Sequence, residues 1–318
     1  MSLNAELSYS EQPILKSGWQ LFRLLSSGQL MPGLAWKNPA YRRKFMLRSL
    51  ATPFTTATLL SRLAVQPQLL EMLQIQPGLP CRLHRPWLSM NMPRQNAAVA
   101  LTSHYQMMAE RLPMQVMNAW LSGRGMTLAT LTGRDEQIFT IRLIADAFLD
   151  KEGEATLIFS DTNNTVLAVL TFTLCLFEGK STLYIGGMQG AKSDVPHEMI
   201  QAATKSCNGL FPKRLLVEAA MVFGKEMNVE TLRAVSNETH IYRSMRYRRK
   251  KQDKLHADYN SFWESVGGSL EANGDYRLPL TMPRKPMEEI ASKKRAEYRR
   301  RYELLDGLQA QTVAVCQR

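Results

Sequence analysis

The chain has 318 residues, of which 45% are apolar, and its mean hydropathy is −0.24. These values are typical of a globular protein with a sizeable core. No window reaches the roughly 18–20 uncharged apolar residues that a membrane-spanning helix needs. The first residues contain neither a basic segment nor an apolar one. We therefore expect no secretory signal and a cytoplasmic protein.

The net charge of +12 is concentrated near the C-terminus. Residues 243–254 carry seven cations and one acid, and residues 293–301 carry six cations and one acid. Such clusters favour phosphate groups, an anionic inner-membrane surface or nucleic acid as partners. We rank nucleic acid last, because no nucleic-acid-binding module accompanies the cations and few aromatic side chains lie among them. The simpler explanation for residues 293–301 is the solvated face of a helix.

The four cysteines are far apart and form no CxxC pair, which favours buried, reduced thiols over a disulfide framework. The five histidines are scattered and no metal-binding motif occurs, so we expect no metal. The cysteines are Cys81, Cys175, Cys207 and Cys316.

Residues 1–80 are predicted to form a helical N-terminal region, which ends at the Pro- and Gly-containing stretch Gln76–Pro80. The α+β core is expected to occupy residues 81–318. Within it, the pattern predicts a strand at Arg82–Met90 and a helix at Gln95–Arg111.

Five strand-like segments follow, and tight turns separate several of them. Consecutive strands joined by such turns predict an antiparallel meander. The segments are Met126–Leu131, Gln137–Ile144, Ala155–Ser160, Thr165–Phe177 and Ser181–Gly186.

The pattern then changes to helices that begin near a proline, at Pro196–Cys207 and Pro212–Met227. A strand is expected at Thr231–Val235, and a late strand at Tyr276–Leu280. Residues 258–266 and 286–304 are expected to be helical. This order predicts an α+β fold with a mixed, mainly antiparallel sheet flanked by helices.

A glycine-rich stretch joins the last meander strand to the next helix, and we expect it to form a turn. Glycines allow backbone N–H groups to approach an anion closely, and a helix N-terminus favours negative charge. A turn that serves packing alone is an equally good interpretation. The candidate binding residues are Gly186, Gly187, Gln189, Gly190, Lys192 and Ser193.

His240 and Tyr242 follow the strand predicted at 231–235, where ligands often bind in α/β sheets. Histidine titrates near neutral pH and tyrosine is a weak acid, so the pair suits general base and general acid roles. The alternative, which spacing alone favours, is that His240 caps the turn and Tyr242 packs on the sheet. Further candidate binding residues nearby are Asn237, Arg243, Arg246, Arg248, Arg249 and Lys250.

Six segments of the chain carry a resemblance to known proteins: Tyr184–Gly190, Ala234–Tyr242, Arg246–Lys250, Tyr259–Gly268, Tyr276–Pro279 and Arg299–Asp306. In this order they resemble the VirK/YbjX family of Gram-negative bacteria. The resemblance implies a virulence and envelope role: support for localisation of an outer-membrane surface protein, and resistance to cationic antimicrobial peptides. It identifies no reaction.

The C-terminal half also looks like the acetyltransferase (GNAT) fold in the order of its elements. That resemblance implies coenzyme A or an acyl-carrier thioester as cofactor, with Gly187, Gln189 and Gly190 at the pyrophosphate and Tyr242 as the acid. The usual Q/R-x-x-G-x-G/A run is not present in this stretch.

Two functions follow from these patterns. The first is acyl transfer to an envelope component, with His240 as base. The second is a non-catalytic accessory protein whose basic segments bind an anionic membrane surface, a lipid or an outer-membrane protein precursor.

Overall fold

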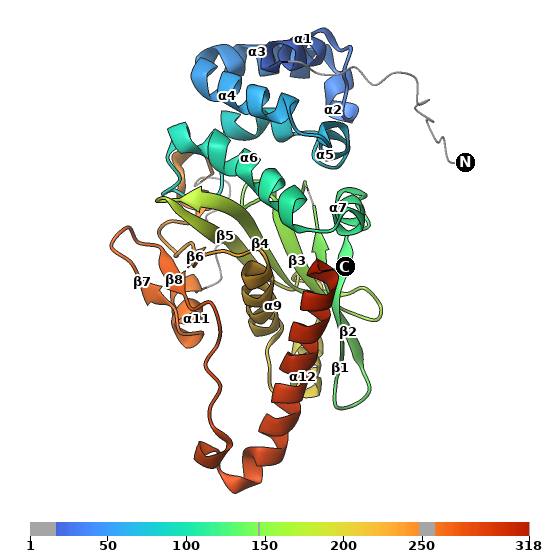
Figure 1. Ribbon diagram of the computed structural model, residues 1–318, viewed down its shortest axis with the longest axis vertical. Helices are drawn as coiled ribbons and strands as arrows, with labels where there is room; N and C mark the ends of the chain where they lie inside the picture. The colour runs from blue at the N-terminus through green and yellow to red at the C-terminus, as the bar shows by residue number, and fades with distance from the viewer. Residues whose placement is uncertain (1–16, 146, 248–257, 318) are drawn as a thin grey trace, which may run out of the picture.

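The computed structural model describes residues 17–145, 147–247 and 258–317. The N-terminal helices lie at one end of the molecule, beyond the sheet, in the view of Figure 1. The helical region predicted for residues 1–80 is confirmed over its described part. Its elements are α1 (Gly18–Ser27), α2 (Leu34–Lys37), α3 (Pro39–Ala51), α4 (Pro53–Ala64), α5 (Leu69–Ile75) and η1 (Leu79–His84).

Local sequence explains where several of these helices begin. Ser17 and Asn38 cap α1 and α3, because their side-chain oxygens accept hydrogen bonds from backbone amides of the first turn. α3 and α4 each start with proline, whose missing N–H costs nothing at that position. The helices pack around the buried ring of Trp36, whose indole N–H donates to the Pro77 carbonyl at 2.7 Å.

The strand predicted at Arg82–Met90 is wrong. Its first residues belong to the 3-10 helix η1, and the chain then runs to α6 with one isolated bridge, between Ser89 and His240. Pro86 lacks the backbone donor that a ladder needs, which disfavours a strand here. The helix predicted at Gln95–Arg111 is confirmed as α6 (Arg94–Arg111), and α7 (Met114–Leu121) follows it.

Arg82 is buried and ties this segment to the core. Its guanidinium pairs with Asp150 at 2.6 Å and with Glu154 at 3.0 Å, both in the connection between β2 and β3. Glu154 also accepts hydrogen bonds from the Tyr105 hydroxyl at 2.7 Å and the Trp87 indole at 3.0 Å. One buried cation thus joins the N-terminal region, α6 and the sheet.

The described residues form one sheet in the order β1-β2-β3-β4-β5-β6-β8-β7, and all neighbours are antiparallel except β5 and β6. The predicted meander and the α+β class, with a mixed and mainly antiparallel sheet, are confirmed. The strands are β1 (Met126–Thr132), β2 (Ile138–Ile144), β3 (Ala155–Asp161), β4 (Val166–Phe177), β5 (Lys180–Gly190), β6 (Thr231–Ala234), β7 (Ser269–Leu270) and β8 (Tyr276–Leu278).

Parallel pairing of β5 and β6 requires a crossover, which α8 (His197–Ser206) and α9 (Pro212–Glu226) supply. α9 packs on β3, β4 and β5. Two further helices complete the fold: α11 (Tyr259–Ser265), which packs near β8, and α12 (Ser292–Cys316), which crosses α9 and β1 (Figure 1). α12 starts later than predicted, because Met287–Glu289 forms the separate 3-10 turn η4.

Most buried apolar side chains form one cluster that extends from Leu21 in α1 to Cys316 in α12, and Ile241, Tyr242 and Tyr247 form a second, smaller cluster. All four cysteines are buried and free, as expected. The boundary at residue 80 stays a prediction. No helix in the described part of the chain is both long and apolar enough to span a bilayer.

β1 lies at the edge of the sheet, and a side chain of α12 occupies its free backbone groups. The Gln311 amide donates to the Thr130 carbonyl, and its oxygen accepts from the Thr130 N–H, both at 2.9 Å. The Gln311 side chain thereby makes the two hydrogen bonds that a residue of a neighbouring strand would make with Thr130.

Candidate functional site

His240 lies where the chain leaves β6. A tight turn forms because Ser236 Oγ accepts hydrogen bonds from the amides of Glu238 and Thr239, both at 3.1 Å. His240 then caps the short helix η2 (Ile241–Arg243), since its Nδ1 accepts from the Tyr242 amide at 3.2 Å. The structure therefore contains the capping role that we weighed against catalysis.

Glu152 is the buried acid beneath His240. It reaches this position because two glycines of β5 leave room for it. A Cβ on Gly186 would lie 2.0 Å from the Glu152 carbonyl oxygen, and a Cβ on Gly187 would lie 2.1 Å from its Oε2. The Gln189 amide donates to both carboxylate oxygens at 3.1 Å. These glycines thus allow a close approach within the protein.

The turn predicted at residues 186–190 is wrong. β5 continues to Gly190, past Ile185, the last of its residues to pair with β6. Side chains of α11 satisfy backbone groups where the two strands separate. The Tyr259 hydroxyl accepts from the Met188 N–H at 3.1 Å and donates to its carbonyl at 3.0 Å. A strand results because these contacts, together with pairing to β4, hold the backbone extended.

His240 is neutral at physiological pH. Burial, with a smaller effect of the Arg243 charge, lowers its pKa to about 4. Its Nε2 lies 3.8 Å from Glu152 Oε1, which is longer than a hydrogen bond, so burial decides its charge. Burial and then the nearby Glu152 raise the pKa of Tyr242. His240 is only 1% exposed and Tyr242 8%.

Asn237 and Arg243 brace this loop against α11. Asn237 Oδ1 accepts from the Tyr259 amide at 3.0 Å, and its Nδ2 donates to Asp258 at 3.1 Å. Arg243 Nε donates to the Asn237 carbonyl at 2.9 Å. Both residues, which the sequence suggested as ligand-binding groups, make structural contacts here.

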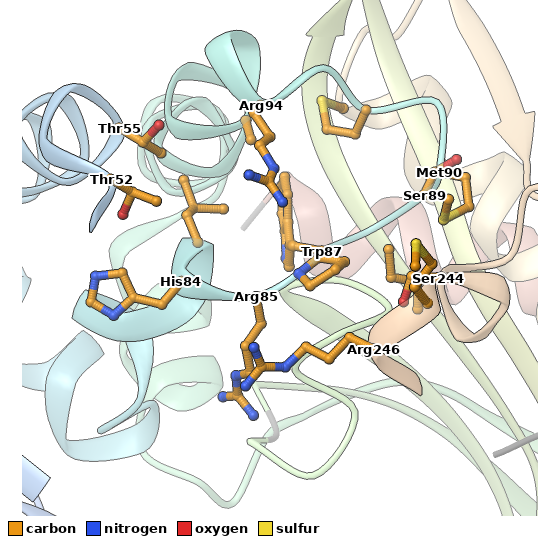
Figure 2. Close-up of a pocket in the computed structure, with 16 residues that line it drawn as sticks. Thr52, Thr55, His84, Arg85, Trp87, Ser89, Met90, Arg94, Ser244 and Arg246 are labelled. Atoms are coloured by element: carbon orange, nitrogen blue, oxygen red, sulfur yellow. The ribbon is translucent and has the colours of Figure 1, made fainter. Parts of the chain in front are cut away.

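A cavity of about 440 Å³ lies beside this loop, between α4, the start of α6 and residues 241–246. Arg85 and Arg246 extend toward one another from opposite sides, and Arg94 reaches in from the start of α6 (Figure 2). Arg85 has an acidic neighbour, Asp150, at 3.6 Å. The other wall residues include Leu83, Trp87, Met90 and Met92, so the lining combines cations with apolar groups.

Two polar atoms of residues at this cavity have no hydrogen-bond partner in the described part of the chain: Ser244 Oγ and His84 Nδ1. A buried polar atom without a partner costs about 1–3 kcal/mol. Burial lowers the pKa of His84 to about 4, so it is neutral and can accept or donate one hydrogen bond on its free side. The cavity thus offers guanidinium groups to a ligand, and two buried polar atoms without partners lie in its wall.

The structure brings together His240, Tyr242, Gly186, Gly187 and Gln189 around Glu152. It places Gly190 elsewhere, at a second cavity, while Lys192 and Ser193 are exposed on the connection to α8. The roles in catalysis and cofactor binding assigned to these residues stay predictions. Arg248, Arg249 and Lys250 lie outside the described residues.

Sequence reasoning missed Glu152, Arg85 and Arg94. Glu152 stands between Asp150 and Glu154 in an alternating acidic stretch, which would normally indicate a solvated turn. Gly186 and Gly187 indicate that another group approaches the backbone closely, but they do not show that this group is Glu152. In the described residues no group of three potential metal ligands occurs.

Comparison with known proteins shows the family to which this chain belongs. Residues 35–314 match the family described as "Protein of unknown function (DUF535)", and the chain belongs to this family. It is 48% identical over 311 residues to the uncharacterized protein YbjX of Escherichia coli (strain K12), covering 98% of this chain and 94% of that protein. An uncharacterized protein of Haemophilus influenzae is 30% identical over 209 residues, covering 66% and 67%. The predicted VirK/YbjX membership is confirmed.

Proposed function

We propose that this protein is an accessory protein that binds an anionic, phosphate-bearing lipid headgroup in the cavity lined by Arg85, Arg94 and Arg246, at a membrane surface. The observation that carries the proposal is that three arginines line one cavity with apolar walls, and that Arg85 and Arg246 extend toward one another across it (Figure 2). Arginine matches phosphate geometry through paired N–H donors. Arg94 and Arg246 have no acidic partner among the described residues, so their charge is available to a ligand.

The surface near the cavity supports a membrane partner. Leu47, Leu50 and Phe54 are exposed on α3 and at the start of α4, and Phe54 is 87% exposed. Leu47 and Leu50 share one face of α3 with Arg43, and Phe54 follows in the first turn of α4. On the other side of the cavity Met245 is 93% exposed. Exposed apolar groups beside cations are typical of surfaces that lie in the lipid interface.

This proposal fits the envelope role that the VirK/YbjX resemblance implies. A protein held at the inner leaflet through a headgroup would act on envelope components as they leave the cytoplasm. Support for surface-protein localisation and for resistance to cationic antimicrobial peptides belongs to this proposal.

Vesicle flotation tests the proposal. The protein should float with vesicles that contain phosphatidylglycerol and stay behind with phosphatidylcholine alone. At about 1 kcal/mol per cation, Arg94→Gln with Arg246→Gln should weaken binding about 30-fold. Lys293→Gln with Arg300→Gln on α12 removes the same charge and should have a much smaller effect. Equal losses from the two pairs would contradict a specific headgroup site.

A second pair of variants tests the contribution of the exposed apolar side chains to membrane binding. Phe54→Ser should weaken flotation about 10-fold or more, because burying a phenylalanine contributes about 1.5–3 kcal/mol. Phe148 is 74% exposed in the connection between β2 and β3. Phe148→Ser should leave flotation unchanged, and a loss as large as that of Phe54→Ser would count against the α3–α4 surface.

Acyl transfer from a coenzyme A or carrier-protein thioester is the second candidate. Its support is the neutral imidazole of His240 beside Glu152 and Tyr242. Nδ1 is the basic atom of this neutral imidazole, so His240 would take the proton of the attacking acceptor once Nδ1 is released from the Tyr242 amide. Tyr242 would protonate the departing thiolate as the C–S bond breaks. Thiol release from acyl thioesters in the presence of envelope precursors tests this, and His240→Asn and Tyr242→Phe should each abolish it. Release that persists in both variants would exclude these roles.

A further inference from the structure

A second cavity, separate from the arginine-lined one, lies at the far end of β5. Its volume is about 620 Å³, within the range of small-molecule sites. It is bounded by the end of β5 at Gly190 and Ala191, the start of α9 and one side of α11. Most of its wall is apolar, and the apolar residues are Leu167, Ile200, Phe211, Pro212, Phe262 and Val266.

One cation stands in this apolar wall without an opposite charge. Lys213 has no acidic partner among the described residues, whereas the neighbouring Arg214 pairs with Glu218 at 3.0 Å. The Lys213 stem crosses Gly190, since a Cβ on that glycine would lie 3.6 Å from Lys213 Cε. Burial lowers the pKa of Lys213. An anion would therefore relieve a desolvated, uncompensated charge.

The charged and apolar groups that line this cavity indicate the chemical class of its ligand. A phosphate-rich ligand requires several donors, as the arginine-lined cavity provides, but here one free ammonium faces a mostly apolar wall. An acyl chain with a terminal carboxylate matches both parts: its methylenes contact the apolar residues, and its single charge pairs with Lys213. The start of α9, with its partial positive charge, lies at the same wall and also favours an anion.

We propose that this cavity binds a medium-chain fatty acid, with the acyl chain between α9 and α11 and the carboxylate at Lys213. This site extends the proposed function, because a protein at the membrane surface would carry both a headgroup site and an acyl-chain site. The two sites share no lining residue.

Calorimetric titration of the purified full chain with decanoate and dodecanoate, below their micelle concentrations and without vesicles, tests the proposal. Binding should saturate at one ligand per chain. Each further methylene that stays in the cavity should tighten binding about fourfold. Because no membrane is present, failure here is distinguishable from failure of the flotation experiment.

Two variants locate the site. Lys213→Ala should weaken dodecanoate binding at least tenfold yet leave dodecanol binding unchanged, while Lys205→Ala, at an exposed lysine of α8, should change neither. Ala191→Trp should fill the cavity and abolish binding of both ligands. Equal affinity of Lys213→Ala and the unmodified chain for dodecanoate would overturn the proposal. Displacement of dodecanoate by coenzyme A lacking an acyl group would also overturn it, because the cavity would then recognise the nucleotide.

Discussion

The carboxylate of Glu152 occupies the space that a side chain on Gly187 would need. A Cβ at that position would lie 2.1 Å from Oε2, closer than any real contact between these atoms. The buried acid and the strand glycine therefore depend on one another, and the loop between β2 and β3 is fixed to β5 at this point.

Gly187→Ala should destabilise the protein by about 1–3 kcal/mol, the usual cost of forcing an extra group into a packed site. Urea unfolding monitored by tryptophan fluorescence measures the change. Gly190→Ala is the matched control, because its Cβ would make only an ordinary contact, 3.6 Å from Lys213 Cε. If both alanine variants unfold at the same urea concentration, the close approach of Glu152 is not a constraint on residue 187.

Stability should fall as the pH is lowered through the window from about 6.5 to about 4, partly because of His240. Burial lowers its pKa to about 4 in the folded state, whereas the unfolded value is about 6.5. The unfolded chain therefore binds the proton first, and His240 should account for about 2 kcal/mol of the loss between pH 7 and 5.

His240→Asn separates this effect from the other histidines. Asparagine keeps an acceptor for the Tyr242 amide but does not titrate. Burial also lowers the pKa of His104 to about 3, and His104 remains in both proteins. The variant should lose less stability than the unmodified chain between these pH values. An identical loss in the two proteins would show that His240 is not a source of the pH dependence.

Replacing Arg82 should be far more damaging than replacing an exposed arginine. Arg82→Met leaves Asp150 and Glu154 without their buried partner, which typically costs about 3–5 kcal/mol. Arg43 is exposed on α3, and Arg43→Met should change stability by less than about 0.5 kcal/mol. Thermal unfolding of the two variants provides the comparison, and similar midpoints would contradict a structural role for the buried ion pairs.

Tyr259→Phe should cost about 1–3 kcal/mol, because both backbone groups of Met188 lose their partner where β5 and β6 separate. Hydrogen exchange should show faster exchange of the Met188 amide in this variant. Tyr298→Phe, on α12, is the control: the Tyr298 hydroxyl has no hydrogen bond to a described residue. Unchanged protection at Met188 would mean that another group satisfies it.

The sheet could be predicted from the sequence because its signals are local. Short segments rich in apolar and β-branched residues mark β1 to β4, and turn residues separate several of them. The prediction of a strand at Arg82–Met90 was wrong because the conformation of that segment depends on ion pairs with acids near residue 150, more than sixty residues away. The turn predicted at 186–190 failed for the same kind of reason, since glycines that admit Glu152 look like glycines of a loop.

The candidate site was only partly predictable. His240 and Tyr242 were found because they follow a strand end, and the structure places them together. The arginines of the first cavity come from positions 85, 94 and 246, and no spacing rule connects residues so far apart. Chemistry that a fold assembles from distant segments leaves no local pattern.

The contact between Gln311 and Thr130 gives α12 a protective role that its basic surface does not suggest. An open strand edge is a template for pairing with another chain, and β1 is such an edge. While α12 is in place, a side-chain amide blocks that template at its middle. Loss of α12, through truncation or proteolysis, would therefore expose the β1 edge to pairing with other copies of the chain.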